Sequence, residues 1–507
     1  MRKNRLATNT MASVSNQIIT IACGFVLPRY MLATYGSTVN GLVSSVTQFL
    51  SIIAFMQMGV GAVVQSALYK PLAEKDDNEV SKIFCSAQKF FRTIAIIFSV
   101  YVGVLIAVYP NFVGKAFNYW FSASLIIIIG VNSFAQYYFG ITNQMLLWAD
   151  QKAYVSLALD SITLIINTII SIIVMKTGGS VQLVKLIATS IYVVRPLGLT
   201  MYVTRHYSIN KRIEYKGEPI KQKWNGLAQH LASAVMDNTD VIILTVFSTL
   251  QNVSIYTIYH LVVNGIRQLI TSFTVGVQAY FGRIYVIWDL HDVKNRFHTA
   301  ETFFHYIVTV LFTCTITLII PFVKVYTKGV TDIDYVLPGF AYIIATAQAG
   351  YCYRLVYFMM IKAAGHYKET QKSALIEMSI NLVTSILFVI KFGLIGVAIG
   401  TFAATLYRTF YFIIYLSKYI LKINVKDTLL IFIVDVIAFC STFLLCKNIV
   451  LREISYPAWI QLAIAHFLIC IGVSSLIYLA YMFFRDRASL ISGLKLIKSK
   501  LKRYGIK

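Results

Sequence analysis

Charged side chains inside long apolar runs are the residues of this sequence most able to do chemistry. The cations in such runs are Arg29, Lys185, Arg195, Arg267, Arg354 and Arg408, and the carboxylates are Asp160, Asp237, Asp240, Glu377 and Asp435. Each charge costs roughly 2.5–3.5 kcal/mol to place in a bilayer, so each needs a structural or functional reason. Guanidinium groups bind phosphate through bidentate, charge-assisted hydrogen bonds. The excess of arginine therefore predicts a ligand that carries pyrophosphate.

Two polar stripes indicate where this chemistry lies. Residues spaced by three or four share one face of a helix, and two neighbouring segments have that rhythm: His230, Ser233, Asp237 and Asp240, then His260, Asn264, Arg267, Thr271 and Thr274. Arg267 is in the middle of its apolar run, which makes it the best candidate for ligand binding. Asp237 and Asp240 have two interpretations: they bind a coupling proton or Na⁺, or they form a salt bridge with Arg267.

The other intramembrane charges leave alternatives open. Arg195 and Arg408 either bind ligand or pair with Asp160 and Glu377 respectively, which would fix helix packing. Arg29 either faces a cavity or extends to the membrane interface. Arg354 is a further candidate for ligand binding. Four uncharged polar residues are candidates for the lining of a cavity: Asn16, Gln48 and, in the second stripe, His260 with Asn264.

Composition places these charges in a membrane. Of 507 residues, 58% are hydrophobic and 13% are charged, whereas soluble domains have about 25% charged residues. Apolar runs long enough to cross ~30 Å of hydrocarbon recur along the chain. The runs are continuous rather than alternating, which favours helices over a barrel. The sequence therefore predicts an all-α polytopic membrane protein.

We expect about fourteen transmembrane helices. Their predicted ranges are 10–34, 38–66, 90–109, 119–147, 153–175, 181–204, 225–248, 252–282, 302–323, 334–361, 373–391, 394–417, 428–446 and 457–484. Most of the 45 Lys and Arg residues fall in the two tails and the even-numbered connections. By the positive-inside rule this predicts that both termini are cytoplasmic. The net charge of +24 is thus explained by topology, without nucleic acid as a partner.

An internal repeat organises the helices. With a shift of 213 residues, Ala87, Phe90, Phe91 and Ile94 align with Ala300, Phe303, Phe304 and Ile307, and Arg195 aligns with Arg408. Asn40 and Pro110 have counterparts near the same shift. These matches predict two parallel six-helix repeats that form N- and C-lobes around a central cavity, with two additional C-terminal helices.

The repeat divides the chain into five predicted regions. Residues 1–207 form the N-lobe, 208–224 a cytoplasmic linker, 225–420 the C-lobe and 421–484 the two additional helices. Residues 485–507 have leucine and isoleucine at helical spacing among lysines, which predicts a basic amphipathic tail on anionic membrane lipids.

Several functional classes are not supported by the sequence. The cysteines are scattered without a C-x-x-C pair, so we expect neither a metal site nor disulfides. No phosphate-binding loop or nucleophile motif occurs, and the predicted outer connections are too short for a catalytic domain. We therefore expect a non-enzyme without a cofactor, and leave coupling to H⁺ or Na⁺ open.

Some local sequences resemble a known family. Leu27-Pro28-Arg29-Tyr30, Tyr35-Gly36, Asn40-Gly41-Leu42-Val43, Met58-Gly59-Val60-Gly61 and the run from Ala67 to Lys75 resemble the start of Wzx-type polysaccharide flippases. Asp237-Asn238-Thr239-Asp240 and Val253-Ser254-Ile255-Tyr256 resemble the matching segment of the second half. The resemblance is one of pattern and topology over the whole chain.

This resemblance implies the multidrug/oligosaccharidyl-lipid/polysaccharide exporter superfamily. The implied function is alternating-access transfer of undecaprenyl-pyrophosphate-linked oligosaccharide to the outer leaflet of the bacterial plasma membrane, for capsule or exopolysaccharide assembly. Implied partners are this lipid-linked oligosaccharide and other polysaccharide-assembly proteins. Two alternatives from the same superfamily are a lipid II flippase, which Tyr30 after Arg29 disfavours, and a cation-coupled multidrug antiporter, which the cationic excess disfavours.

Overall fold

The computed structural model describes residues 2–113, 116–213, 238–366 and 368–485. These residues are nearly all helical and contain no β-strand, which confirms the predicted all-α fold. Three predictions fall wholly or largely outside them: the linker, the first polar stripe up to Asp237, and the basic tail. The described residues divide into two compact units, of which the first holds residues 1–261, 329–334 and 381–397.

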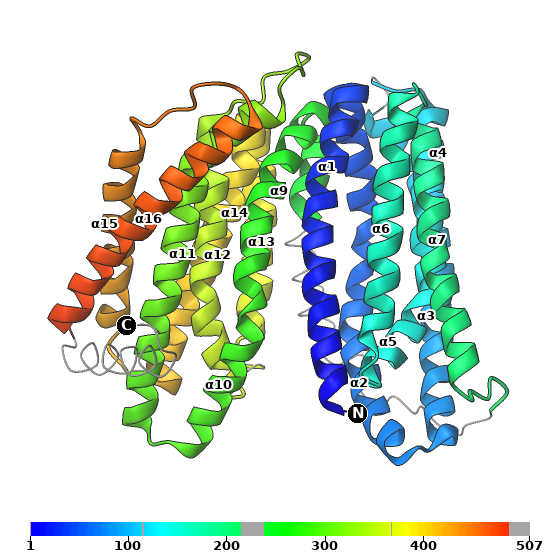
Figure 1. The fold of residues 1–507 in the computed structure, drawn as a ribbon, viewed down its shortest axis with the longest axis horizontal. Coiled ribbons are helices and arrows are strands. Elements are labelled where there is room, and N and C mark those ends of the chain that lie inside the picture. The colour runs from blue at the N-terminus through cyan, green and yellow to red at the C-terminus, as the bar shows by residue number, and fades with distance from the viewer. Residues whose placement is uncertain (1, 114–115, 214–237, 367, 486–507) are drawn as a thin grey trace. The chain divides into compact units, whose positions relative to one another are not determined.

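The first unit contains the N-terminal helices (Figure 1). They are α1 (Arg2–Ser51), the short 3₁₀ turn η1 (Ile52–Ala54), α2 (Phe55–Glu74), α3 (Asp77–Val113), α4 (Tyr119–Ala135), the π-helical turn η2 (Gln136–Gly140), α5 (Ile141–Ala149), α6 (Ala153–Lys176) and α7 (Val181–His206). Within this unit α1 packs along α6, and α6 along α7. The first half of α9 (Leu250–Ser272) and a helical segment over Asn238–Phe247 also belong to it.

A glycine divides α1 into two helical halves. The helical dihedrals are interrupted at Gly36, where φ is 77°, a value that glycine adopts without steric cost. The break exposes the backbone N–H of Ser37, which donates to Asp332 Oδ2 at 2.7 Å, while Ser37 Oγ donates to Asp332 Oδ1 at 2.7 Å. Asp332 thus caps the second half of α1.

The second unit holds residues 262–328, 335–380 and 398–507. Its helices are the second half of α9, α10 (Thr274–Ile287), α11 (Leu290–Tyr326), α12 (Pro338–Ala363), most of α14 (Leu394–Tyr415), the π-helical turn η3 (Leu416–Ile420), α15 (Val425–Cys446) and α16 (Tyr456–Arg485). Helix α13 (Gln371–Phe392) contributes its first half. Within this unit α11 packs against α10, α12, α15 and α16; Figure 1 shows α15 and α16 beside α11.

The predicted repeat is visible in the helix boundaries. Helices α3 and α11 each have 37 residues and begin 213 positions apart, and each contains one proline near its end, Pro110 and Pro321. Helices α7 and α14 also begin 213 positions apart. The fold class predicted from the sequence, two six-helix repeats followed by two further helices, is therefore confirmed.

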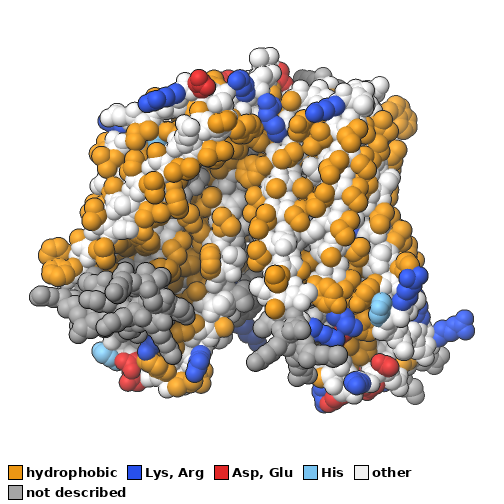
Figure 2. All heavy atoms as spheres, in the orientation of Figure 1, with side chains coloured by type: hydrophobic (Ala, Val, Ile, Leu, Met, Phe, Trp, Pro, Cys, Tyr) orange, Lys and Arg blue, Asp and Glu red, His pale blue; other side chains and the backbone are white. Residues whose placement is uncertain are grey.

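The outward surface is that of a membrane protein. Ten helical stretches of the described residues are long and apolar enough to span a bilayer. Large apolar side chains lie exposed on them, such as Ile162, Ile169 and Ile173 of α6 and Ile433, Val436 and Leu445 of α15. Figure 2 shows hydrophobic side chains over the middle of the helices and most charged ones toward their ends. Exposed apolar surface on this scale requires lipid contact, so the chain is a multi-pass membrane protein.

Candidate functional site

Two arginines share one buried glutamate in the second unit. Glu377 of α13 accepts hydrogen bonds from Arg354 of α12 through Oε1 and from Arg408 of α14 through Oε2. All three residues are less than 9% exposed, and Glu377 is 1% exposed. The sequence predicted the partnership of Arg408 with Glu377, and the structure adds Arg354 as a second cation. This set is called the arginine cluster below.

The arginine cluster has more positive than negative charge. One carboxylate neutralises one of two guanidinium groups, and the buried Nε of Arg408 has no hydrogen-bond partner among the described residues. The Arg408 guanidinium also lies over the ring of Phe412, 5.0 Å from its centroid, and such contacts stabilise a cation only partly. The uncompensated charge makes this region electrostatically suited to an anion.

Tyr351 connects Arg267 to the arginine cluster. The guanidinium carbon of Arg267, on α9, lies 4.5 Å from the centre of the Tyr351 ring, and that of Arg354 lies 4.3 Å from it. Tyr351 and Arg267 are both partly exposed, unlike the buried cluster. Sequence reasoning selected Arg267 and Arg354 but missed Tyr351, because nothing in its spacing distinguishes it from the many interfacial tyrosines of this chain.

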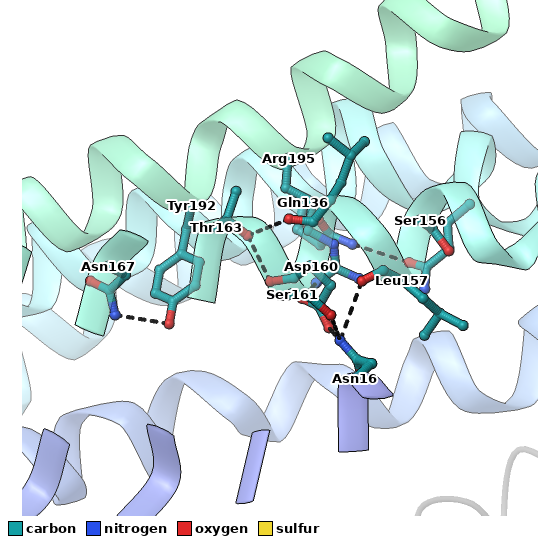
Figure 3. Close-up of polar contacts among 12 residues, drawn as sticks. Asn16, Gln136, Ser156, Leu157, Asp160, Ser161, Thr163, Asn167, Tyr192 and Arg195 are labelled. Atoms are coloured by element: carbon teal, nitrogen blue, oxygen red, sulfur yellow. Dashed lines mark hydrogen bonds and ion pairs between the residues drawn. The ribbon is translucent and has the colours of Figure 1, made fainter. Parts of the chain in front are cut away.

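The first unit contains a corresponding arginine–carboxylate salt bridge, whose third member is an asparagine and not a second arginine. Arg195 of α7 forms a salt bridge with Asp160 of α6 at 2.7 Å. Asn16 of α1 donates to Asp160 Oδ2 at 3.2 Å, to Ser161 Oγ at 3.0 Å and to the Leu157 carbonyl at 3.4 Å. Figure 3 shows the Asn16 amide of α1 pointing toward Asp160 of α6. The set of Asn16, Asp160 and Arg195, called the asparagine cluster, is electrically balanced and ties α1, α6 and α7 together.

A polar pocket lies beside Arg195. It encloses about 360 Å³ and is lined by Asn132, Ser133, Gln136, Tyr137, Gln144, Tyr192 and Arg195. Gln136 opens the π-helical turn η2, where an extra residue in the turn redirects side chains. Gly140 at the end of that turn allows close packing, because a Cβ there would lie 3.0 Å from Pro196 of α7.

A second pocket in the first unit contains Lys185. It encloses about 300 Å³, and its lining comes from both halves of α1, from α7 and from α9: Leu27, Pro28, Met31, Asn40, Val43, Ser44, Thr47, Gln48, Lys185, Thr257, Ile258 and Leu261. Asn40 donates to Ser254 at 2.8 Å, and Gln48 donates to Asn238. The predicted lining residue Gln48 therefore lies at a pocket, together with an intramembrane lysine.

The remaining predicted residues that the structure describes lie on α1, on α9 and in the helical segment over Asn238–Phe247. Asp240 is 3% exposed and accepts a hydrogen bond from the Tyr256 hydroxyl at 2.8 Å. The same tyrosine ring stacks on His260 at 5.3 Å. Arg29 follows Pro28 on α1 and Asn264 precedes Arg267 on α9, both partly exposed. Asp237 lies outside the described residues.

Potential metal ligands meet at one exposed place in the described residues. Asp289, His291 and Asp292 bring their ligand atoms within 4.8 Å of one another. Asp289 is the N-cap of α11 and accepts from the backbone N–H of Asp292 at 2.9 Å. Helix capping accounts for this arrangement, so it does not indicate a metal site.

Comparisons with known proteins identify the fold. No family model and no curated protein sequence matches this chain. Among solved structures, the lipid II flippase MurJ in an inward closed conformation is similar with a TM-score of 0.71 and 16% identity, over 94% of this chain and 98% of that one. An inward-facing multidrug resistance MATE family transporter of the MOP superfamily has a TM-score of 0.63 and 14% identity, over 84% of this chain and 98% of that one. At such identities the likeness establishes a shared fold.

Proposed function

We propose that this protein is a flippase that transfers undecaprenyl-pyrophosphate-linked oligosaccharide from the cytoplasmic to the outer leaflet, for capsule or exopolysaccharide assembly. Both termini are cytoplasmic in this proposal, and transfer proceeds by alternating access between two lobes. The protein is a transporter rather than an enzyme. Its partners are the lipid-linked oligosaccharide, anionic lipids at the basic tail and other polysaccharide-assembly proteins.

The observation that carries the proposal is the positive charge of the arginine cluster together with Arg267. Pyrophosphate is a compact anion, and guanidinium groups recognise it by paired hydrogen bonds. Arg354 and Arg408 are held in place by Glu377, so little rotamer entropy remains to be lost when an anion binds. Arg267, partly exposed beside Tyr351, supplies the accessible contact. In this proposal Arg29 adds further positive charge along the route, whereas the charge of Arg195 is balanced by Asp160 and contributes less.

Two alternative functions share the fold. A multidrug antiporter would need to attract organic cations, and an arginine-rich interior repels them. The fold likeness also covers 94% of this chain for the lipid II flippase but 84% for the multidrug transporter. A lipid II substrate has the same carrier chemistry, so the anion site is compatible with it. The choice of glycan rests on the family resemblance in the sequence.

Reconstitution tests this function directly. Purified protein in liposomes is given a fluorescent undecaprenyl-pyrophosphate oligosaccharide, and access of an external quencher reports transfer. We expect protein-dependent transfer, and at least a tenfold slower rate with Arg267→Ala, because a charge-assisted contact contributes about 1.5–3 kcal/mol. Arg267→Lys should recover only part of the rate, since an ammonium cannot bind bidentately.

The matched control is Arg296→Ala in the same unit. Arg296 is exposed and lies over Trp288 at 3.6 Å, so its removal should leave transfer unchanged. Normal transfer by a folded Arg267→Ala protein would refute the proposed anion site. Movement of cationic dyes against an ion gradient, without transfer of the lipid, would instead establish the antiporter. Competition between lipid II and the glycan-bearing lipid distinguishes the two flippase functions.

A further inference from the structure

A second polar centre of the second unit is built around His305 on α11. Its Nδ1 lies 2.8 Å from Asp435 Oδ2 on α15, and its Nε2 lies 2.9 Å from the Tyr357 hydroxyl on α12. The other oxygen of Asp435 accepts hydrogen bonds from Thr309 at 3.0 Å and from Tyr478 of α16. His305 is 0% and Asp435 is 5% exposed. Four helices thus meet at one buried histidine–carboxylate pair.

The same helix carries a second histidine–carboxylate pair two turns earlier. His298 Nδ1 lies 2.6 Å from Glu301 Oε2, and the side chain of His298 is 30% exposed whereas that of Glu301 is 0% exposed. The other carboxylate oxygen of Glu301 is buried without a hydrogen-bond partner among the described residues. Glu301 is also within electrostatic reach of the Tyr357 hydroxyl. Tyr357 therefore lies between the two pairs.

The composition of the pair makes it a place to hold a proton. Asp435 forms no ion pair with any lysine or arginine of the described residues; the basic group beside it is His305, which is charged only when it is protonated. With one proton shared, the pair is neutral overall, and without that proton it carries a buried negative charge. Burial of an uncompensated charge is costly in a membrane. The energy of this packing therefore depends on whether the proton is present.

The Tyr357 hydroxyl can hydrogen-bond to His305 both when the imidazole is neutral and when it is protonated. Tyr357 donates to a neutral imidazole and accepts from an imidazolium, so the hydrogen bond to His305 survives proton transfer. Chains of Asp, Glu and His inside membranes are typical of proton relays. His298, Glu301, Tyr357, His305 and Asp435 form such a series, from a partly exposed residue to a buried one.

We propose that His305 and Asp435 bind a proton that drives this transporter. His298 and Glu301, near the N-terminal end of α11, conduct that proton to the buried pair. The ligand is H⁺, and the residues that bind it are others than the coupling candidates Asp237 and Asp240 chosen from the sequence. The coupling of this proton to lipid transfer rests on the proposed function, whereas the existence of the proton site does not.

The elements around the pair would respond to its charge. Facing groups are Tyr353 and Tyr357 on α12 and Tyr478 on α16, while Tyr481 and Arg485 of α16 and Asp427 of α15 lie farther along the same helices. Helix α10, which also packs on α11, contributes Tyr280, bonded to Arg296. Loss of the proton leaves an uncompensated charge where α15 and α16 meet α11, so proton release loosens the packing of these two helices.

The first experiment detects the proton without relying on transport. Infrared difference spectra of the reconstituted protein between high and low pH report the carbonyl band of a protonated carboxylic acid and the ring bands of an imidazolium, so they detect the proton on either member of the pair. We expect a titrating band in the wild type that is lost in Asp435→Asn and displaced in His305→Gln, where the partner cannot ionise. The control is Asp427→Asn on the same helix, whose side chain is 51% exposed; it should retain the buried band. A band unaffected by Asp435→Asn would overturn the proposal.

The second experiment connects the proton to transport. With a difference of one pH unit across the vesicle, wild-type transfer should change by up to about tenfold, the full value of that gradient. Asp435→Asn and His305→Gln should transfer at a rate independent of the gradient, while Asp427→Asn follows the wild type. An equal response in all four proteins overturns the coupling. If the wild type transfers no lipid, the proposed function fails, and the infrared titration still decides whether the proton site exists.

Discussion

The two copies of the repeat place a salt bridge at the same position and surround it differently. In the first copy Asp160 pairs with Arg195, and in the second Glu377 pairs with Arg408, 213 positions after Arg195. The third member is Asn16 in the asparagine cluster and Arg354 in the arginine cluster. One cluster is therefore neutral and partly exposed, and the other is buried with an additional positive charge.

The difference shows how duplication separates structure from function. The pair of Asp160 and Arg195 is balanced in charge and, together with Asn16, holds three helices together, which is a structural role. In both clusters the buried Nε of the arginine, Arg195 or Arg408, has no hydrogen-bond partner among the described residues, so the clusters differ in net charge and not in this respect. Burying an unmatched charge lowers stability, so the additional arginine in the second copy points to a use of its charge beyond helix packing.

Removing the shared carboxylate should have the largest effect. In Glu377→Gln two buried guanidinium groups lose their counter-charge, which should destabilise the protein by about 3–5 kcal/mol. We expect a lower midpoint of SDS or thermal denaturation and a lower yield. Glu369→Gln is the matched control, because Glu369 is exposed and lies two residues before the start of α13. A Glu377→Gln protein as stable as that control would mean that the arginines do not depend on Glu377.

Removing one arginine should affect transport more than stability. In Arg408→Gln the pair of Arg354 with Glu377 remains and is neutral, so the denaturation midpoint should fall less than in Glu377→Gln. Transfer of a pyrophosphate-linked lipid should slow by about tenfold, since one charge-assisted contact of at least 1.4 kcal/mol is lost. Arg195→Gln in the first copy should slow transfer less, because its charge is already neutralised by Asp160. Equal losses in the two variants would remove the functional distinction between the clusters.

The fold was predictable because membrane helices are encoded locally. Continuous apolar runs located α6, α7, α13, α15 and α16 within a few residues. The break in α1 lies at Gly36, between the predicted spans 10–34 and 38–66. Its capping partner could not be predicted, because Asp332 comes from a loop almost 300 residues away. Predictions on residues 214–237 and 486–507 stay predictions.

The candidate site was predictable only in part, because its side chains come from different helices and local sequence does not reveal which of them face one another. Matched positions in the repeat predicted the pairs of Asp160 with Arg195 and Glu377 with Arg408. The second cation, Arg354, and the ring of Tyr351 come from a third helix whose register the sequence does not reveal. His305 escaped notice because its partner Asp435 follows 130 residues later, and Glu301 because it lies just before the predicted span at 302–323.

The smallest predicted effect tests whether the asparagine cluster is structural. Asn16→Ala removes hydrogen bonds to Asp160, Ser161 and the Leu157 carbonyl, which should cost about 0.5–1.5 kcal/mol in total because the site is partly exposed. Asp160→Asn should cost a similar amount. Because the two side chains touch, the double variant should lose less than the sum of the single losses, with a coupling energy of at least ~0.5 kcal/mol in a double-mutant cycle. Additive losses would mean that Asn16 contributes nothing through Asp160. A loss of transfer greater than the loss of stability would show that the first copy, too, acts on the substrate.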